Sequence, residues 1–173
     1  MTKDEWIKLI ASNTDEFNAK KPDSLDLSEC DLSALDIKNA DFTNVDFQGA
    51  NFSECRLESV NFSHANLEGA DLTRVHAAEC DFQGANLQGT DFSYSSVTFS
   101  NFSDADMSGT VLNEADLSDS DFSGCENLSA CRFDDGTIWP DPDKLPEDFD
   151  STYSFDLSSL KDEEEAEQGE FEY

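Results

Sequence analysis

The sequence predicts an all-β solenoid, in which the chain turns every five residues and closes one square coil every twenty. The first observation is an apolar central residue that recurs at every fifth position from Leu27 to Phe122 without a slip. Neither a helix nor a strand repeats with that period. The second observation is that every twentieth central residue from position 42 is phenylalanine, which predicts one core column: Phe42, Phe62, Phe82, Phe102 and Phe122. A period of twenty built from fives indicates four short segments per coil.

Each five-residue unit has the same order of residue types. A small apolar residue lies two positions before the central residue, Asp or Asn lies between them, and a polar residue usually follows. Two inward side chains separated by an outward one make a very short extended segment, so the remaining two residues must turn the chain. Glycine at positions 49, 69, 89 and 109 suits a turn with positive φ. We therefore expect about five to six coils over residues 25–140, stacked about 4.8 Å apart.

Several of these units carry a family resemblance. The units ANLEG (65–69), ADLTR (70–74), ANLQG (85–89) and ADLSD (115–119) resemble the pentapeptide-repeat family. The resemblance covers residues 25 to about 138, and it implies a right-handed quadrilateral β-helix. It implies little about function, because most members of the family have none assigned.

The N-terminal residues 1–24 are expected to form a helical cap over the first coil. Thr2 and Glu5 have the spacing of a capping box. Trp6, Ile10 and Phe17 then fall on one face of a helix over residues 3–20, which we expect to break near residues 12–14. A helix that binds a partner is the alternative interpretation of this segment.

The C-terminal end of the repeat is predicted from a change of frame. The frame slips by one residue at positions 126–127, and Leu128, Phe133 and Ile138 are expected to resume it as central residues. Trp139 is the expected lid over the last coil. Pro140 lacks the amide that a ladder needs, so the coils are expected to stop there.

Residues 141–173 change character and are expected to form an acidic, flexible tail. They hold 13 acidic residues against two lysines, a composition typical of disorder. In an alternative, the tail docks back onto the rod through Phe149, Tyr153, Phe155 and Leu157. We find no helical dimerising segment of the kind seen in quinolone-resistance members of the family, so a monomer is expected rather than a dimer.

The side chains that most often take part in catalysis or metal binding occupy regular positions of the repeat in this sequence. His64 and His76 fall on outward positions of different faces, and serines and carboxylates recur as repeat residues. The sequence therefore predicts neither an enzyme nor a cofactor site. Four cysteines, at positions 30, 55, 80 and 125, occupy the small inward position and are expected to be buried, not to bind metal.

The net charge of the chain limits the classes of molecule that it can bind. Lys and Arg total 10 against 40 Asp and Glu, a net charge of −30. Such a chain is repelled by nucleic acid and by anionic membranes. We therefore expect no direct binding to either, and a protein partner that is basic or itself binds nucleic acid. No apolar stretch is long enough to cross a membrane, and the N-terminus lacks the apolar core of a signal peptide, so a cytoplasmic location is expected.

The third face of the predicted rod departs from the repeat. Its outward position abandons Asp and Asn at Arg56, His76 and Ser96, and its central residues include no phenylalanine. Its corners carry Arg74, Tyr94 and Phe99. Exposed aromatic residues beside arginine are typical of a protein-binding surface, so these six residues form the candidate partner surface. The alternatives are drift in a tolerant surface, or an acidic tail that covers the two aromatic residues.

Two functions follow from these observations. The first is a non-enzymatic interaction module, a rigid acidic rod that binds a protein partner. The second is implied by the resemblance: some pentapeptide-repeat proteins are similar to duplex DNA in width and charge and occupy the DNA groove of type II topoisomerases. The net charge of −30 favours this DNA-mimic alternative. The short rod, the missing dimerising segment and the absence of a large loop between coils count against it.

Overall fold

The repeat is built from turns that close on themselves every five residues. The computed structural model describes residues 1–152, and in it the carbonyl of Phe62 accepts a hydrogen bond from the amide of Ala65 at 2.9 Å. Between them, His64 has a φ of +57°, and equivalent corners have positive φ throughout the rod. A left-handed residue at the second turn position is the geometry of a type II turn. Each turn therefore redirects the chain after a segment only two or three residues long.

The Asp or Asn before each central residue stabilises this turn. Its side-chain oxygen accepts a hydrogen bond from the backbone amide two residues later, as between Asn61 and Ser63 at 2.8 Å and between Asp121 and Ser123 at 2.9 Å. Such a bond mimics a turn of the backbone. The hydrogen bonds from Ser123 also hold the pKa of the Asp121 carboxyl below its usual value. The recurring Asp and Asn of the sequence thus have a local, structural role.

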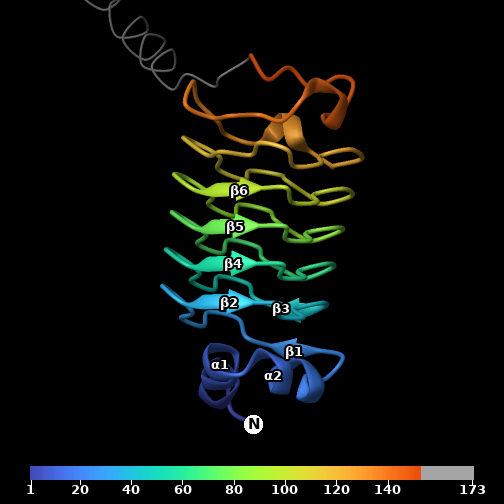
Figure 1. Ribbon diagram of the computed structural model, residues 1–173. Helices are drawn as coiled ribbons and strands as arrows, with labels where there is room; N and C mark the ends of the chain where they lie inside the picture. Colours follow the sequence, from blue (N-terminus) through green and yellow to red (C-terminus); the bar gives the residue numbers. More distant parts are fainter. Residues whose placement is uncertain (153–173) are drawn as a thin grey trace, which may run out of the picture.

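Successive coils pair in parallel with a register of twenty residues. Asp41 pairs with Asn61, Asp46 with residue 66, and residue 51 with Asp71, so successive sides of the coil each have their own ladder. This is the register that the phenylalanine column predicts. Figure 1 shows the coils stacked along one axis, with the helices at the N-terminal end.

The regular elements are short because the turns interrupt every ladder. The helices are α1 (Lys3–Ser12), α2 (Thr14–Lys20), and the 3₁₀ turns η1 (Leu128–Ala130) and η2 (Pro142–Lys144). The strands are β1 (Leu25–Asp26), β2 (Asp36–Lys38), β3 (Val45–Asp46), β4 (Arg56–Glu58), β5 (His76–Ala78) and β6 (Ser96–Thr98). Strand β1 pairs with β3, and β2, β4, β5 and β6 form a four-stranded parallel sheet.

The core is a column of phenylalanine rings along the axis of the rod. Phe62, Phe82, Phe102 and Phe122 stack nearly parallel, with centroids 5.0, 4.9 and 4.6 Å apart. Phe42 lies below them and is tilted by 53° against Phe62. All of these rings are buried, and each buries about 150–250 Å².

The column continues into the N-terminal helices. Phe17 packs edge-on against Phe42 at 5.4 Å, and Trp6 packs against Phe17 at 5.7 Å. Thr2 and Glu5 form a capping box at the start of α1. Asn13 ends α1 and caps α2, which places the break between the helices within the expected residues 12–14.

The C-terminal coil differs from the expected frame. Val111 pairs with Arg132, 21 residues on, as expected after one slip, but Asp116 pairs with Ile138, 22 residues on. Ile138 therefore occupies an outward position and is 54% exposed, so its prediction as a central residue is wrong. The cause is a tight turn in which the Asp134 carboxylate accepts the amide of Gly136 at 3.1 Å. This turn adds a second extra residue to the coil.

Packing at this end extends beyond the predicted boundary at residue 140. Trp139 contacts Phe122, Phe133 and Phe149, with centroids 5.9, 5.2 and 4.8 Å away. The amide of Phe122 also donates to the carbonyl of Lys144 at 2.9 Å. The predicted docking of residues 153, 155 and 157 lies outside the described residues. Within residues 1–152, no helix is long and apolar enough to cross a membrane.

Candidate functional site

One side of the rod is built differently from the other sides. There, β2, β4, β5 and β6 pair over three residues each, whereas most other contacts between coils are single bridges. The middle strands carry Arg56, His76 and Ser96 where other sides have Asp or Asn. At these three positions no side-chain oxygen accepts a hydrogen bond from the backbone amide two residues later. The residue that carries this amide is part of the strand instead. Three strands that depart from the repeat, together with β2, which keeps Asp36, therefore form a small continuous sheet.

Buried serines accept main-chain amides at the corner behind this sheet. The amide of Cys80 donates to the hydroxyl of Ser100 at 3.1 Å, and the amide of Ser100 donates to the hydroxyl of Ser120 at 3.0 Å. The Ser120 hydroxyl in turn donates to the carbonyl of Val97 at 3.0 Å. Because buried amides need an acceptor, these hydroxyls hold the corner of the sheet in place.

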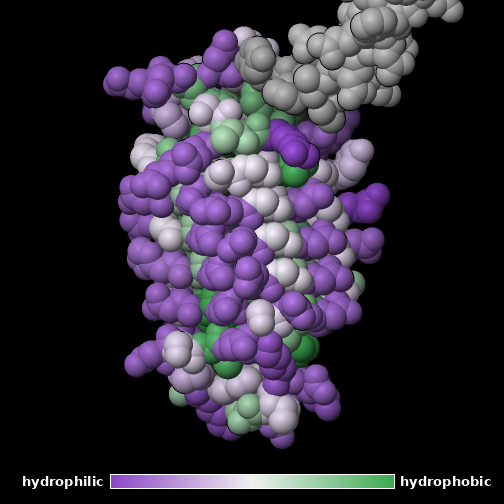
Figure 2. All heavy atoms as spheres, turned by 180° about the vertical axis from the view of Figure 1, so that it is seen from behind, coloured by the Kyte–Doolittle hydropathy of each residue, from purple (hydrophilic) through white to green (hydrophobic). Residues whose placement is uncertain are grey.

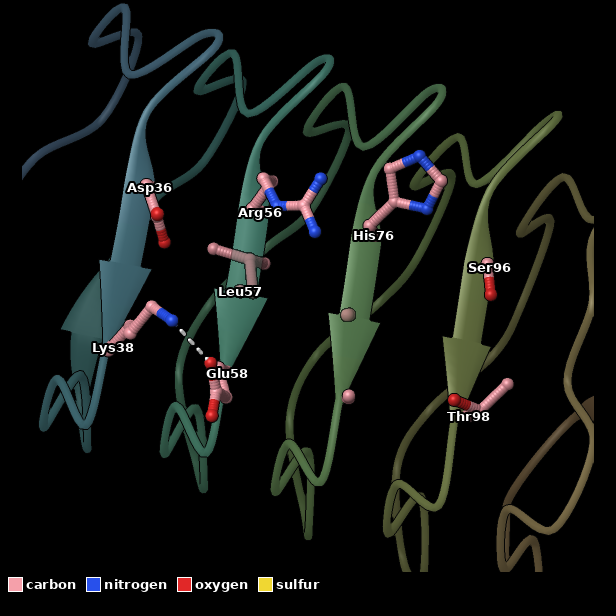
Figure 3. Close-up of a pocket in the computed structure, with 10 residues that line it drawn as sticks. Asp36, Lys38, Arg56, Leu57, Glu58, His76, Ser96 and Thr98 are labelled. Atoms are coloured by element: carbon pink, nitrogen blue, oxygen red, sulfur yellow. Dashed lines mark hydrogen bonds and ion pairs between the residues drawn. The ribbon is translucent and has the colours of Figure 1, made fainter.

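A shallow groove of about 190 Å³ runs across the outer surface of the sheet. Figure 3 shows Arg56, His76 and Ser96 side by side on β4, β5 and β6, with the Arg56 guanidinium extending toward β5. Lys38 forms an ion pair with Glu58 at 2.6 Å beside them. Sequence reasoning missed Lys38, Glu58 and Thr98 as part of this surface. The signal was available, because they follow the central residues of the side that lacks Asp and Asn in its middle strands.

Two aromatic side chains stand at the corners of the sheet. Tyr94 is 62% exposed and Phe99 is 63% exposed. Both occupy left-handed corner positions, with φ of +60° and +54°. The Arg74 guanidinium lies 5.7 Å from the centroid of the Tyr94 ring, in a cation–π contact. The corner geometry directs these side chains outward, away from the core.

Three of the four basic residues between positions 25 and 140 gather on the same side, and the fourth, Arg132, pairs with Val111 on another side. Between residues 25 and 131, the Lys and Arg residues of the sequence are Lys38, Arg56 and Arg74. Within the described residues Lys38 is paired with Glu58, and neither arginine has an ion pair. Seen from behind, the rod is covered mainly by hydrophilic side chains (Figure 2). The sheet side thus differs from the other sides in its charge as well as in its backbone.

The structure places all six candidate residues on or beside this sheet. Arg56, His76 and Ser96 occupy one register position on adjacent strands. Residues 74 and 94 lie at one corner of the sheet, and Phe99 lies at the other. We call the six residues together the sheet-side surface.

The remaining reactive side chains do not converge. Burial raises the pKa of the Cys55 and Cys80 thiols to about 11, and that of Cys125 and Cys131 to about 12, so all four are protonated at neutral pH. His64 lies against the backbone of Gly84 at another corner, not beside the sheet. No group of three His, Cys, Asp or Glu residues within residues 1–152 is arranged to hold a metal ion.

Comparisons with known proteins identify the repeat. A model of pentapeptide repeats matches in eight copies, over residues 26–63, 55–93 and 96–135. The pentapeptide-repeat protein Rfr23 from the cyanobacterium Cyanothece 51142 is 21% identical and has a TM-score of 0.63, covering 66% of this chain and 90% of that one. The protein alr5209 from Nostoc Pcc 7120 is 29% identical with a TM-score of 0.51, covering 58% of this chain and 77% of that one.

A further solved structure is a trypsin-treated variant of QnrB1, a plasmid-mediated fluoroquinolone resistance protein. It is 25% identical with a TM-score of 0.48, covering 66% of this chain and 62% of that one. No curated protein matches the chain. The fold shared with Rfr23 and alr5209 is a right-handed β-helix solenoid.

Proposed function

The chain belongs to the pentapeptide-repeat family, and from that premise we propose that it is a non-enzymatic protein–protein interaction module. The observation that carries the proposal is the pair of exposed aromatic residues, Tyr94 and Phe99, on either side of the sheet. Aromatic and arginine side chains dominate the binding energy of protein interfaces. Here they gather on the side that departs from the repeat.

The construction of the rod supports this role. Main-chain bonds join each coil to the next, and the corners of the sheet are held by buried hydroxyls. A surface on such a scaffold is already ordered before a partner arrives, so little conformational entropy is lost on binding. The sheet-side surface is therefore suited to recognition by shape.

The organisation that we propose with this function is a helical cap at residues 1–24, a rod of five to six coils at 25–140 and an acidic segment at 141–173, of which Lys144 and Phe149 contact the last coil. The contacts of Trp6, Ile10 and Phe17 with the rod support the cap, and those of Trp139 support a lid at the other end. We further propose that the protein acts in the cytoplasm as a monomer. Five free cysteines, of which four are buried, are compatible with that compartment.

The proposal is tested by capture of the partner. Tagged full chain and the double variant Tyr94→Ala/Phe99→Ala are compared in pull-downs from the source cells. We expect at least one protein that the unchanged chain retains and the double variant loses. Ile138→Ala is the control for loss of an exposed apolar side chain, and it lies two coils beyond Ser96 on the same side of the rod. Equal retention by all three proteins would contradict the assignment of the surface.

The DNA-mimic function is the second candidate, favoured by the net charge of −30 and by the small number of basic residues in the rod, four between positions 25 and 140. A rod of this kind would occupy the positively charged DNA-binding groove of a type II topoisomerase. DNA gyrase supercoiling is measured with and without the protein, and again with a fluoroquinolone present. If the protein at micromolar concentration neither inhibits supercoiling nor protects the gyrase from the fluoroquinolone, the DNA-mimic function is excluded.

A further inference from the structure

We propose that the sheet-side surface binds an extended protein segment in which an isolated carboxylate lies two residues from an apolar side chain. The inference rests on the proposed interaction function and specifies the chemistry of its partner. It follows from the way charge and apolar area are divided across the sheet.

One edge of the surface carries basic side chains on β4 and β5, and none of its arginines is in an ion pair with a described residue. Arg56 and His76 lie at equivalent positions on β4 and β5, and Arg74 lies at the adjoining corner. The chain has 40 acidic residues, yet neither arginine is in an ion pair with a described residue. A guanidinium presents paired N–H donors that match a carboxylate. The basic edge is therefore available to an acidic group of a partner.

On β5 and β6 the other edge of the same sheet is uncharged, whereas the Lys38–Glu58 ion pair occupies this edge on β2 and β4. On β5 and β6 the outward residues two positions after His76 and Ser96 are Ala78 and Thr98, and exposed Phe99 adjoins them. Two residues along a strand span about 6.6 Å. A bound extended segment has the same spacing between side chains that point to one side. A carboxylate over the Arg56 edge thus places the side chain two residues away over Ala78, Thr98 and Phe99.

The surroundings favour a single carboxylate over an acidic run. Asp36 on β2 pairs with Arg56 in the strand register, and Glu58 lies on β4. Glu79 lies at the corner beside β5, and Asp116 follows on the next coil. Each would repel additional negative charge within a few ångströms. The same carboxylates disfavour nucleic acid, whose phosphates are closely spaced. The segment is therefore expected to be neutral apart from the carboxylate that meets the arginines.

The test uses three fluorescent eight-residue peptides with serine at the even positions. The first peptide has a single glutamate at position 3, phenylalanine at position 5 and alanine at positions 1 and 7, and glutamine or lysine replaces the glutamate in the other two. Binding to the full chain is measured by fluorescence anisotropy. We expect the glutamate peptide to bind at least tenfold more tightly than either of the others.

The variants assign the effect to the basic edge. Arg56→Gln/Arg74→Gln is expected to weaken the glutamate peptide about tenfold, because a charge-assisted hydrogen bond is roughly twice as strong as a neutral one. Lys8→Gln/Lys20→Gln is the matched control, since it removes the same charge from the N-terminal helices. Circular dichroism confirms that each variant keeps the fold.

The outcomes separate this inference from the proposed function. Preference for the lysine peptide, equal weakening by the two double variants, or no binding of the glutamate peptide would each overturn the inference. If the lysine peptide binds and Tyr94→Ala/Phe99→Ala abolishes that binding, the surface is still an interaction site and only the charge of its partner is wrong. Failure of the pull-down comparison, in contrast, overturns the proposed function itself.

Discussion

The substitution Ser120→Ala tests how the sheet side holds its corners. The Ser120 hydroxyl is fully buried, accepts the amide of Ser100 at 3.0 Å and donates to the carbonyl of Val97 at 3.0 Å. Removing one oxygen atom therefore deprives two buried main-chain groups of these bonds. The change removes almost no apolar contact, so the effect on stability reports the hydrogen bonds.

The expected loss follows from the cost of unpaired buried groups. Each buried donor or acceptor that loses its partner costs about 1–3 kcal/mol, and we expect about 2–4 kcal/mol of unfolding free energy for the two groups together. With a urea m-value of about 2 kcal/mol/M, the midpoint of unfolding falls by about 1 M or more.

Urea unfolding followed by circular dichroism provides the measurement, with two controls. Ser120→Thr keeps the hydroxyl and is expected to stay close to the unchanged protein, because Thr90 and Thr110 already make the same kind of bond from inward positions. Ser108→Ala removes a hydroxyl that makes no hydrogen bond within the described residues. If Ser120→Ala loses no more stability than Ser108→Ala, the role assigned to the buried serines is refuted.

Three further predictions concern the core, the C-terminal end and the thiols. Phe102→Ala removes a ring stacked on both sides and is expected to cost about 3–5 kcal/mol in urea unfolding; a loss below 1 kcal/mol would contradict the column as the main core. Phe149→Ala should expose the indole of Trp139 and increase its quenching by acrylamide, whereas unchanged quenching would show that the ring does not cover it. The raised pKa of Cys125 and Cys131, about 12, favours the folded state fully below the unfolded thiol pKa of about 8.5. That contribution is lost as pH rises toward 12, so the urea midpoint should fall between pH 8 and 10.5, and by less in Cys125→Ala/Cys131→Ala; equal falls would contradict the burial of the thiols.

The fold could be predicted because every coil repeats the same five-residue pattern of apolar and polar residues. The five-residue repeat predicts the turns, and the column from Phe42 to Phe122 predicts the twenty-residue register that the ladders adopt. Ile138 was misplaced because a tight turn between Asp134 and Thr137 adds a residue. Such a turn depends on local hydrogen bonds and leaves no mark on the spacing of apolar residues.

The side of the rod that carries the candidate surface could be predicted from sequence, but the strands and contacts that form this surface could not. Loss of Asp and Asn at Arg56, His76 and Ser96 marks the correct side of the rod. The sequence did not reveal that this loss lengthens the strands and brings Lys38 and Glu58 to the surface as an ion pair. Predicting that result requires the hydrogen-bond partner of the backbone amide that no longer binds an Asp or Asn side chain. That partner lies on the neighbouring coil.

The twenty-residue register also sets the unit in which this protein can change length. Removal of one complete coil, such as residues 65–84, returns every later residue to the side of the rod that it occupied before. Removal of a single five-residue unit instead rotates the rest of the chain by one side and carries Tyr94 and Phe99 away from the strands below them. The shifts to 21 and 22 residues occur at Arg132 and Ile138, in the last coil, where few residues remain to be displaced. Insertions and deletions in the middle of the rod are therefore expected to survive in multiples of twenty, while the final coil can vary one residue at a time.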